Sequence, residues 1–361
     1  MTKTARSFSL RTELLCRLTR PVKSMRATVT TANEMAARSG GAMDPPYEDA
    51  TPSASAVRVA VCVVTFRRPD MLARLLKAIG NLEVPPGAEV DVVVVDNDVE
   101  RPVRSVVEDL AARIPLHVRY AAEPRPGVSF ARNAAIAEAA GSDCIAFVDD
   151  DMTVRPNWLA ALLRTQRITG AAAVAGPVEP AFAYPPPRWL AEVFGLCYVR
   201  PTPGRPLHAA TAGNLLLDLR VLKALRLSFA HDFSRMGGED TQLISDLAAA
   251  GSEIVWAPDA VVMEHIPAPR MSAGWLFRRW FRYGVIDSHV GLRRRPGFAG
   301  RTEALARGAL RVAGGSLLML PALVAASWHG AAAPMRRVYT IARGLGMITG
   351  TLGWHPRAYG T

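Results

Sequence analysis

The chain has 361 residues, of which 50% are hydrophobic and 21% charged, so it can bury a full core, and this composition excludes wholesale disorder. Its net charge of +11 is compatible with three kinds of partner: nucleic acid, an anionic membrane surface and ligands that carry phosphate. The basic residues are mainly arginines and are scattered along the chain rather than gathered into the runs of a nucleic-acid groove, which argues against nucleic acid.

The N-terminal segment and the cysteines bear on where the protein works. Residues 1–56 are rich in Arg, Ser and Thr and lack the apolar stretch of a secretory signal. We expect a disordered extension or an early start codon with Met43 as the true start, and a transit peptide is the alternative. No Cys-x-x-Cys pair occurs, so the cysteines are expected to be reduced core residues of a cytoplasmic protein. They are Cys16, Cys62, Cys144 and Cys197.

Strand and helix patterns alternate from residue 57 onward, which is typical of a parallel sheet with helices on both faces. The predicted strands are 57–66, 90–95, 116–120, 144–148, 172–176, 211–217 and one or two short strands within 254–263. The predicted helices are 69–79, 103–112, 128–140, 156–168, 239–250 and 273–288, with helical, apolar sequence beyond 301. Residues 177–206 are rich in proline and predict a long functional or mobile loop. The fold class is therefore α/β and Rossmann-like, with a doubly wound, mostly parallel sheet and a helical C-terminal extension.

Aspartates follow two of the predicted strands at the point where each strand ends. They are Asp96 after the second strand and Asp149, Asp150 and Asp151 after the fourth. Ligands of open parallel sheets bind at this edge. Asp96 can equally be a turn former. Three consecutive aspartates repel one another unless a cation compensates, and oxygen ligands suit Mg²⁺ or Mn²⁺ carrying a diphosphate.

Five short motifs in a fixed order give the chain a resemblance to a known family. They are VTFRR at 64–68, VDN at 95–97, PGVSFARN at 126–133, FVDDD at 147–151 and GGEDT at 237–241. In these motifs the chain resembles the family 2 glycosyltransferases of the GT-A fold, and most of all those that add glucose in succinoglycan-type exopolysaccharide assembly. The resemblance implies a transferase domain over 57–290, with residues 291–361 as an apolar helical region. It also implies an inverting transfer from a nucleoside diphosphate sugar, most simply a UDP-hexose, to a saccharide acceptor.

The resemblance assigns roles on the donor side of the site. Asp96 would accept from the N3–H of a uracil, Asp149 would face the donor ribose or sugar, and Asp151 would bind the Mn²⁺ or Mg²⁺ cofactor between the phosphates. The other donor-binding candidates are Thr65, Arg67, Arg132 and Asp150. Arg132 can equally be a solvated charge on a helix.

On the acceptor side, displacement at a sugar carbon needs a base for the attacking hydroxyl, opposite the leaving diphosphate. By resemblance Asp240 is this catalytic base and Glu239 orients the acceptor. Because the pair opens a helix after two glycines, a helix-capping role is the alternative. His265 is a candidate metal ligand by analogy with related folds, although a lone histidine at a strand end is more often a packing residue.

Two other enzyme classes and one subclass can be weighed against this interpretation. Asp149-x-Asp151-x-Thr153 matches the nucleophile motif of haloacid dehalogenase-type phosphatases, but that motif normally follows the first core strand. A dinucleotide-binding oxidoreductase would need a Gly-x-Gly-x-x-Gly turn after the first strand, and the chain has none there. Processive synthases carry Gln-x-x-Arg-Trp where this chain has Leu276 before Arg279 and Trp280, which favours a single addition.

The C-terminal region raises the question of a membrane. Residues 312–328 are apolar except for two serines, but Gly314, Gly315 and Pro321 make them marginal as a spanning helix. Together with arginines at 278, 279, 282 and 293–295, this segment favours peripheral docking on the inner face of the plasma membrane, next to a lipid-linked acceptor. The alternative is that 312–328 covers the core of the transferase domain.

Overall fold

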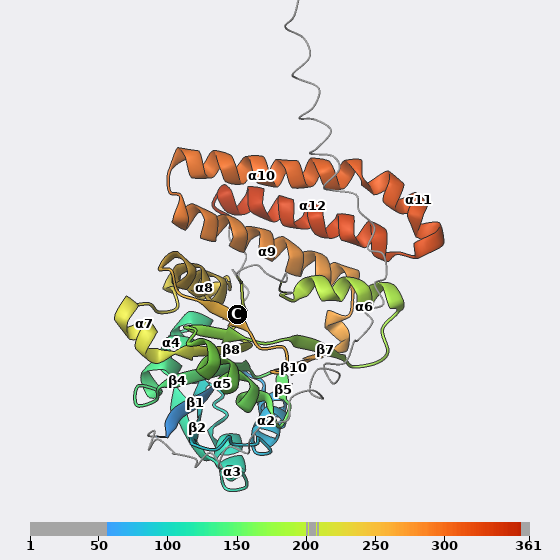
Figure 1. Ribbon diagram of the computed structural model, residues 1–361. Helices are drawn as coiled ribbons and strands as arrows, with labels where there is room; N and C mark the ends of the chain where they lie inside the picture. The colour runs from blue at the N-terminus through green and yellow to red at the C-terminus, as the bar shows by residue number, and fades with distance from the viewer. Residues whose placement is uncertain (1–55, 200, 202–206, 208, 355–361) are drawn as a thin grey trace, which may run out of the picture. The chain divides into compact units, whose positions relative to one another are not determined.

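The computed structural model describes residues 56–199, 201, 207 and 209–354, without the side chains of 327–329. The expectations for residues 1–55, which include Met43 and Cys16, lie outside this range. A seven-stranded sheet with the order β3-β2-β1-β4-β8-β6-β9 forms the centre (Figure 1). All its neighbouring strands are parallel except those that pair with β8, which confirms a mostly parallel sheet. The strands are β1 (Val57–Thr65), β2 (Ala88–Asp96), β3 (His117–Ala122), β4 (Cys144–Asp149), β6 (Ala173–Ala175), β8 (Asn214–Asp218) and β9 (Ile254–Trp256).

Helices cover both faces of this sheet because the central strands are apolar on both sides, as in β1 and β2. One core contains side chains of α2, α3 and α5, and the other contains side chains of α4, α7 and α8. The doubly wound arrangement is thereby confirmed. These helices are α2 (Pro69–Ile79), α3 (Arg104–Ala111), α4 (Val128–Glu138), α5 (Trp158–Thr169), α7 (Leu219–Leu225) and α8 (Glu239–Ala249).

The prediction of a loop over 177–206 is wrong for its first two thirds. A second, three-stranded sheet has the order β5-β10-β7, in which β7 (Val178–Phe182) is an edge strand parallel to β10 (Val262–Ile266). An edge strand tolerates Pro180. Helix α6 (Arg188–Phe194) and a 3-10 turn (Gly195–Cys197) follow. The sequence hid these elements because β7 pairs with residues far along the chain, and the prolines dominated the local pattern. Strand β5 (Met152–Val154) was not predicted either.

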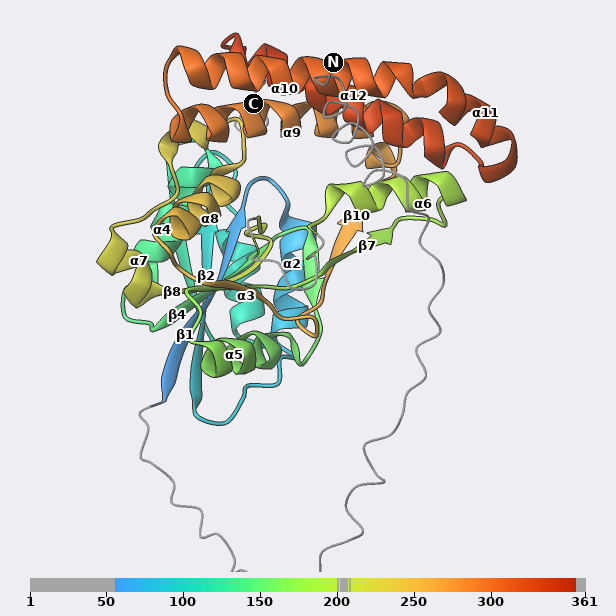
Figure 2. The same cartoon turned by 45° about the horizontal axis from the view of Figure 1, so that its top comes forward.

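Four long helices follow β10. They are α9 (Ala273–Arg294), α10 (Phe298–Leu317), α11 (Met319–His329) and α12 (Ala332–Thr351). Helices α9 and α10 both pack on α12, and Figures 1 and 2 show α10 on the side of α9 away from the sheet. The helical C-terminal extension is thus confirmed. The division of domains at residue 290 stays a prediction, since α9 runs through that position.

Glycines let these helices approach closely. A Cβ on Gly284 of α9 would lie 2.0 Å from the backbone oxygen of Arg343 in α12, and one on Gly346 of α12 would lie 1.9 Å from that of Phe281. Among the described helices, no single one is long and apolar enough to cross a membrane. Helix α10 and residues 319–326 meet those criteria only as a pair, bent by 41°. The segment 312–328 is therefore broken between two helices.

Candidate active site

The site is built where β1, β2 and β4 end. The parallel register places Thr65 beside Asp96, and Val64 beside Asp149, so the ends of three motifs meet at one edge of the sheet. Asp150 and Asp151 follow directly in the turn to β5. Sequence reasoning predicted this meeting, because parallel strands in one sheet bring their carboxyl ends together.

Arginines from three elements neutralise the aspartate triplet. Asp149 accepts a hydrogen bond from Arg132 of α4 at 2.9 Å. Asp150 accepts from Arg68 at 2.9 Å and from Thr65 at 2.9 Å. Asp151 accepts from Arg68 at 3.1 Å and from Arg270 at 2.9 Å. The compensation that the triplet requires is therefore present within the chain, as guanidinium groups.

Burial shifts the pKa values of these carboxyls. Desolvation raises the pKa of Asp150 to about 6, against the opposing effect of Arg68. The pKa of Asp149 is also raised, first by burial, with Arg132 opposing and with Asp151 and Asp240 adding repulsion. The negative charge of Asp240 is thus close enough to raise the pKa of Asp149. Acids with raised pKa values in one place are typical of functional sites.

Arg132 joins the triplet to the start of α8. Its guanidinium donates to the carboxylate of Glu239, and both side chains are buried. A solvated surface charge at Arg132 is therefore wrong. Burial raises the pKa of Glu239 to about 7 despite Arg132, and Oε2 of Glu239 has no hydrogen-bond partner within the described part of the chain. A buried carboxyl oxygen of this kind either is protonated or awaits a donor from a ligand.

Asp240 is held by a loop that the sequence analysis missed. Its Oδ2 accepts from the amide of Ala212 at 3.3 Å, and its Oδ1 accepts from the amide of Thr241 at 2.6 Å. The next residue of the loop, Gly213, lies against the triplet, since a Cβ there would be 3.0 Å from Oδ2 of Asp149. Residues 211–213 therefore connect Asp149 and Asp240. The available signal was a glycine inside the predicted strand 211–217, a position that often marks a close backbone approach.

Asn214, the first residue after this loop, anchors it through side-chain hydrogen bonds. Its side chain accepts from the indole of Trp158 at 2.8 Å and donates to the carbonyls of Pro177 at 2.9 Å and Ala260 at 2.7 Å. It is fully buried, so its amide can satisfy these groups only in one orientation. These three hydrogen bonds of Asn214 therefore fix the position of the preceding residue, Gly213.

The PGVSFARN motif positions the loop before α8. Gly127, with φ +134°, lies where a Cβ would be 2.7 Å from that of Ser234, and its amide donates to Asn97 at 2.9 Å. Asn133 exchanges two hydrogen bonds with the backbone of Phe229, at 2.8 and 2.9 Å. Residues 229–234 are thereby fixed to α4, and they lead into Gly238 and Glu239.

Asp96 and Arg67 have partners within the protein. Asp96 is fully buried and accepts from the amides of Asp98 at 3.0 Å and Val103 at 2.8 Å, and from the hydroxyl of Tyr120 at 3.0 Å. These are the bonds of a turn former. Arg67 has φ +56° and pairs with Asp98 at 2.6 Å, which lowers the pKa of that carboxyl. The donor-binding roles of both residues stay predictions.

Comparison with known proteins identifies the family. The model of glycosyl transferase family 2 matches residues 60–225. The succinoglycan biosynthesis protein ExoM of Rhizobium meliloti (strain 1021) is 36% identical over 234 residues, which are 65% of this chain and 75% of that protein. The chain belongs to glycosyltransferase family 2. It is therefore a glycosyltransferase, and the phosphatase alternative at Asp149 and Asp151 has no support in this match.

A solved structure agrees with the fold of this transferase. The mannosyltransferase PcManGT from Pyrobaculum calidifontis, in complex with GDP-Man and Mn²⁺, superposes with a TM-score of 0.59 at 20% identity. The match covers 80% of this chain and 86% of that chain. The GT-A fold is thereby confirmed.

The described part of the transferase has carboxylates that could bind a divalent metal, but not a complete set of protein ligands around one. Within the described ranges, no group of three or more His, Cys, Asp and Glu side chains is arranged to hold a metal ion. His265 is beside Asp151 through its amide, which donates to the Asp151 carbonyl at 2.8 Å. Its Nε2 lies 3.1 Å from the hydroxyl of Thr153, and burial lowers its pKa. The role of His265 as a ligand stays a prediction.

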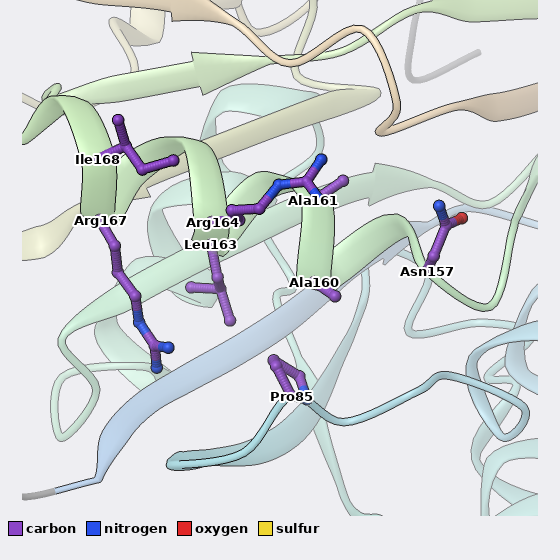
Figure 3. Close-up of a pocket in the computed structure, with 8 residues that line it drawn as sticks. All are labelled: Pro85, Asn157, Ala160, Ala161, Leu163, Arg164, Arg167 and Ile168. Atoms are coloured by element: carbon purple, nitrogen blue, oxygen red, sulfur yellow. The ribbon is translucent and has the colours of Figure 1, made fainter. Parts of the chain in front are cut away.

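Two arginines and a glutamate at the site were not among the predicted residues. Arg68 was part of the first motif, but Arg270 comes from the 3-10 turn Ala268–Arg270 after β10, where no pattern pointed to it. Buried Glu264 lies 3.6 Å from Arg270 and 3.3 Å from Arg279, so it joins the triplet to α9. The pocket shown in Figure 3 lies elsewhere, between α5 and Pro85, and the residues that line it include no acid.

Proposed function

We propose that this glycosyltransferase moves one sugar, with inversion, from a nucleoside diphosphate sugar to a saccharide acceptor, using Mn²⁺ or Mg²⁺. The observation that carries the proposal is the arrangement of Asp149 and Asp240. Both contact the loop 211–213, Asp149 beside Gly213 and Asp240 through the amide of Ala212. A donor-side acid and an acceptor-side acid that contact neighbouring residues of one short loop suit a displacement that needs both at one sugar, the leaving group on one side and the base on the other.

On the donor side, the arginines supply positive charge for a diphosphate. Arg68 and Arg270 both bind Asp151, and Arg68 also binds Asp150. Bidentate guanidinium groups are well suited to phosphate oxygens. When a diphosphate enters, these groups can exchange a carboxylate for a phosphate oxygen, so the donor side keeps its charge balance. The proposed contacts of the nucleoside and the sugar are Arg67, Thr65, Asp96 and Asp149.

The metal would be held by Asp151, with His265 as the second proposed ligand. One or two carboxylates together with phosphate oxygens are a common way to bind Mg²⁺, so the absence of a three-ligand cluster in the described residues fits this chemistry. When bound, the cation would neutralise the charge that develops on the departing nucleoside diphosphate.

On the acceptor side, Asp240 takes the proton of the attacking hydroxyl. The new bond forms between that oxygen and the anomeric carbon while the bond from this carbon to the diphosphate oxygen breaks, which inverts the configuration. Glu239 would orient the acceptor through Oε2, the buried oxygen that lacks a partner among the described groups. Arg132, bound to Glu239 and Asp149, holds the two sides at a fixed separation.

The remaining parts of the proposal concern substrate and place. A UDP-hexose is the proposed donor, by resemblance to the glucosyltransferases of exopolysaccharide assembly. The similar protein ExoM is named for succinoglycan biosynthesis, which supports an acceptor that is a growing saccharide. We further propose that the acceptor is linked to a polyprenyl lipid and that the protein works in the cytoplasm, on the inner face of the plasma membrane.

A donor panel tests the core of this proposal. The thermal unfolding midpoint is measured with UDP- and GDP-sugars, each with and without MnCl₂, and the donor that stabilises the protein is then used in transfer to a lipid-linked saccharide. We expect metal-dependent stabilisation by one nucleotide sugar and release of the nucleoside diphosphate with a product of inverted configuration. Stabilisation without metal, or a product of retained configuration, would contradict the proposal.

A further inference from the structure

Helix α10, which lies on the side of α9 away from the sheet (Figure 1), and helix α11 carry exposed leucines. The exposed fractions are 79% for Leu317, 71% for Leu320 and 73% for Leu310. The surface also includes Leu318 and Leu323, and we call these five residues the leucine surface. Large apolar side chains gathered on one surface are unusual in a protein that nothing else covers.

Arginines surround the leucine surface, and acids are missing from it. Exposed Arg301 and Arg307 lie on α10 before it, and exposed Arg336 lies early in α12. The two helices are close here, since a Cβ on Gly315 of α10 would be 3.4 Å from the backbone oxygen of Arg337. From residue 304 to residue 354 the described sequence contains five arginines and no Asp or Glu, and Arg343 among them is bound to Asp287 of α9. Glu303 pairs with Arg295 at 3.0 Å and with Arg307 at 2.5 Å. The balance of charge on α10 to α12 is therefore positive.

The shape of the two helices suits a flat apolar layer. The 41° bend at Leu318 keeps leucines of both helices exposed, while Gly308 and Gly315 bring α10 against α12 on its other face. A bent, one-sided apolar surface with cationic residues around it is typical of helices that lie in the plane of a membrane interface.

We propose that the leucine surface docks on the interface of an anionic lipid bilayer, with Arg301 and Arg336 over the lipid phosphates. The charge favours lipid over a second copy of the chain. A twofold dimer through this surface would place the arginines of one copy against those of the other, whereas anionic headgroups attract them.

One of the α9 arginines that the sequence suggested for membrane contact is occupied within the protein. Arg279 is half-buried and bound to Glu264 and Tyr283, so it is not available to a headgroup. Helix α9 lies next to the site, since Gly238, which directly precedes Glu239 and α8, contacts Ile286 of α9. The proposal deepens the function proposed above, which supplies the lipid-linked acceptor, but vesicle binding can be measured without any acceptor.

Flotation of the full chain with vesicles tests the proposal. The vesicles are phosphatidylcholine alone or phosphatidylcholine with about one third phosphatidylglycerol. We expect the wild type to float with the anionic vesicles and to be released by high salt. The double variant Leu317→Glu, Leu320→Glu should bind about tenfold less, because it removes exposed apolar contacts and adds negative charge. The matched control is Ile168→Glu, which changes an isolated apolar side chain on α5 that is 77% exposed.

A second variant separates charge from apolar contact. Arg301→Gln, Arg336→Gln should weaken binding to anionic vesicles and reduce its dependence on salt. Equal flotation of the leucine variant and the wild type would overturn the proposal, as would a wild type that ignores anionic vesicles. A dimer that the leucine variant dissociates, with vesicle binding unchanged, would assign the surface to a second copy. Thermal stabilisation by the donor is recorded for every variant, so a failure of the proposed transferase chemistry is seen separately from a failure to dock.

Discussion

The site edge of the sheet and the helical layer of α9 to α12 are held together in different ways. At the site edge, buried carboxylates of one element meet arginines of another, as in Asp149 with Arg132 and Asp151 with Arg270. In the helical layer, backbone meets backbone at glycines such as Gly284, and Arg343 of α12 is paired with Asp287 of α9 at 2.9 Å. The site edge depends on which charged side chains are present. The helical layer depends on glycines, because a larger side chain at these positions would overlap the neighbouring helix. Substitutions should therefore affect function at the first and stability at the second.

Asp151→Ala should have the largest effect. We expect transfer to fall at least about 1000-fold and metal-dependent donor binding to disappear. The fold should survive, because Arg68 keeps Asp150 and Arg270 keeps Glu264 as partners. The measurements are turnover and the donor-induced shift of the unfolding midpoint in Mn²⁺. Asp259→Ala, at an exposed ion pair with Arg164, is the control. Retained donor affinity in Mn²⁺ would remove Asp151 from the metal site.

Asp240→Asn should lose transfer by about 100- to 1000-fold while donor binding is unchanged, because a base acts on the acceptor hydroxyl. Turnover and donor titration of the same preparation measure the two effects. Asp246→Asn changes a second aspartate of α8, one that binds Gln242, and should leave transfer intact. An Asp240→Asn chain that fails to fold would favour the helix-capping role instead.

In the helical layer, Gly284→Ala should destabilise the protein by about 3 kcal/mol, because its Cβ would overlap the backbone of Arg343 and Met347. Gly291→Ala, on the same helix, meets nothing within 4 Å and should stabilise the protein by up to about 1 kcal/mol, as alanine favours a helix. Denaturant unfolding of both variants gives the comparison. Equal effects at the two positions would mean that α9 and α12 are not closely packed.

Glu239→Gln tests how the buried carboxyl group of Glu239 affects the pH dependence of stability. The pKa of Glu239 is about 7 in the folded chain, above its ordinary value of 4.5, so its contribution to stability is complete below pH 4.5 and is lost as the pH rises through 7. We expect the wild type to lose about 2 kcal/mol over this interval from Glu239, and the glutamine variant to lose less. Unfolding free energies at pH 5 and pH 8 measure the difference. A steeper loss in the variant would mean that Glu239 is ionised throughout.

The sequence by itself determined the sheet, the order of its elements and the family. Strand and helix periods are local, so the strand at 57–66 and the helix at 69–79 were predicted within a residue of β1 and α2. Parallel strands end at one edge, which is why Asp96 and the aspartate triplet were expected together. The motif pattern alone was enough to indicate the family 2 resemblance that the comparisons confirmed.

The tertiary structure decided what depends on distant partners. Arg270 reaches Asp151 across 119 residues of chain, and Asn214 reaches Ala260 across 46, and neither pairing has a local pattern. The strand β7 was hidden for the same reason, since an edge strand with a proline is recognisable only beside its partner β10. The helical layer is a further case, because the sequence shows that α10 and α11 are apolar but not which leucines remain exposed. Only the packing of Gly308 and Gly315 against α12 turns the leucines of α10 outward.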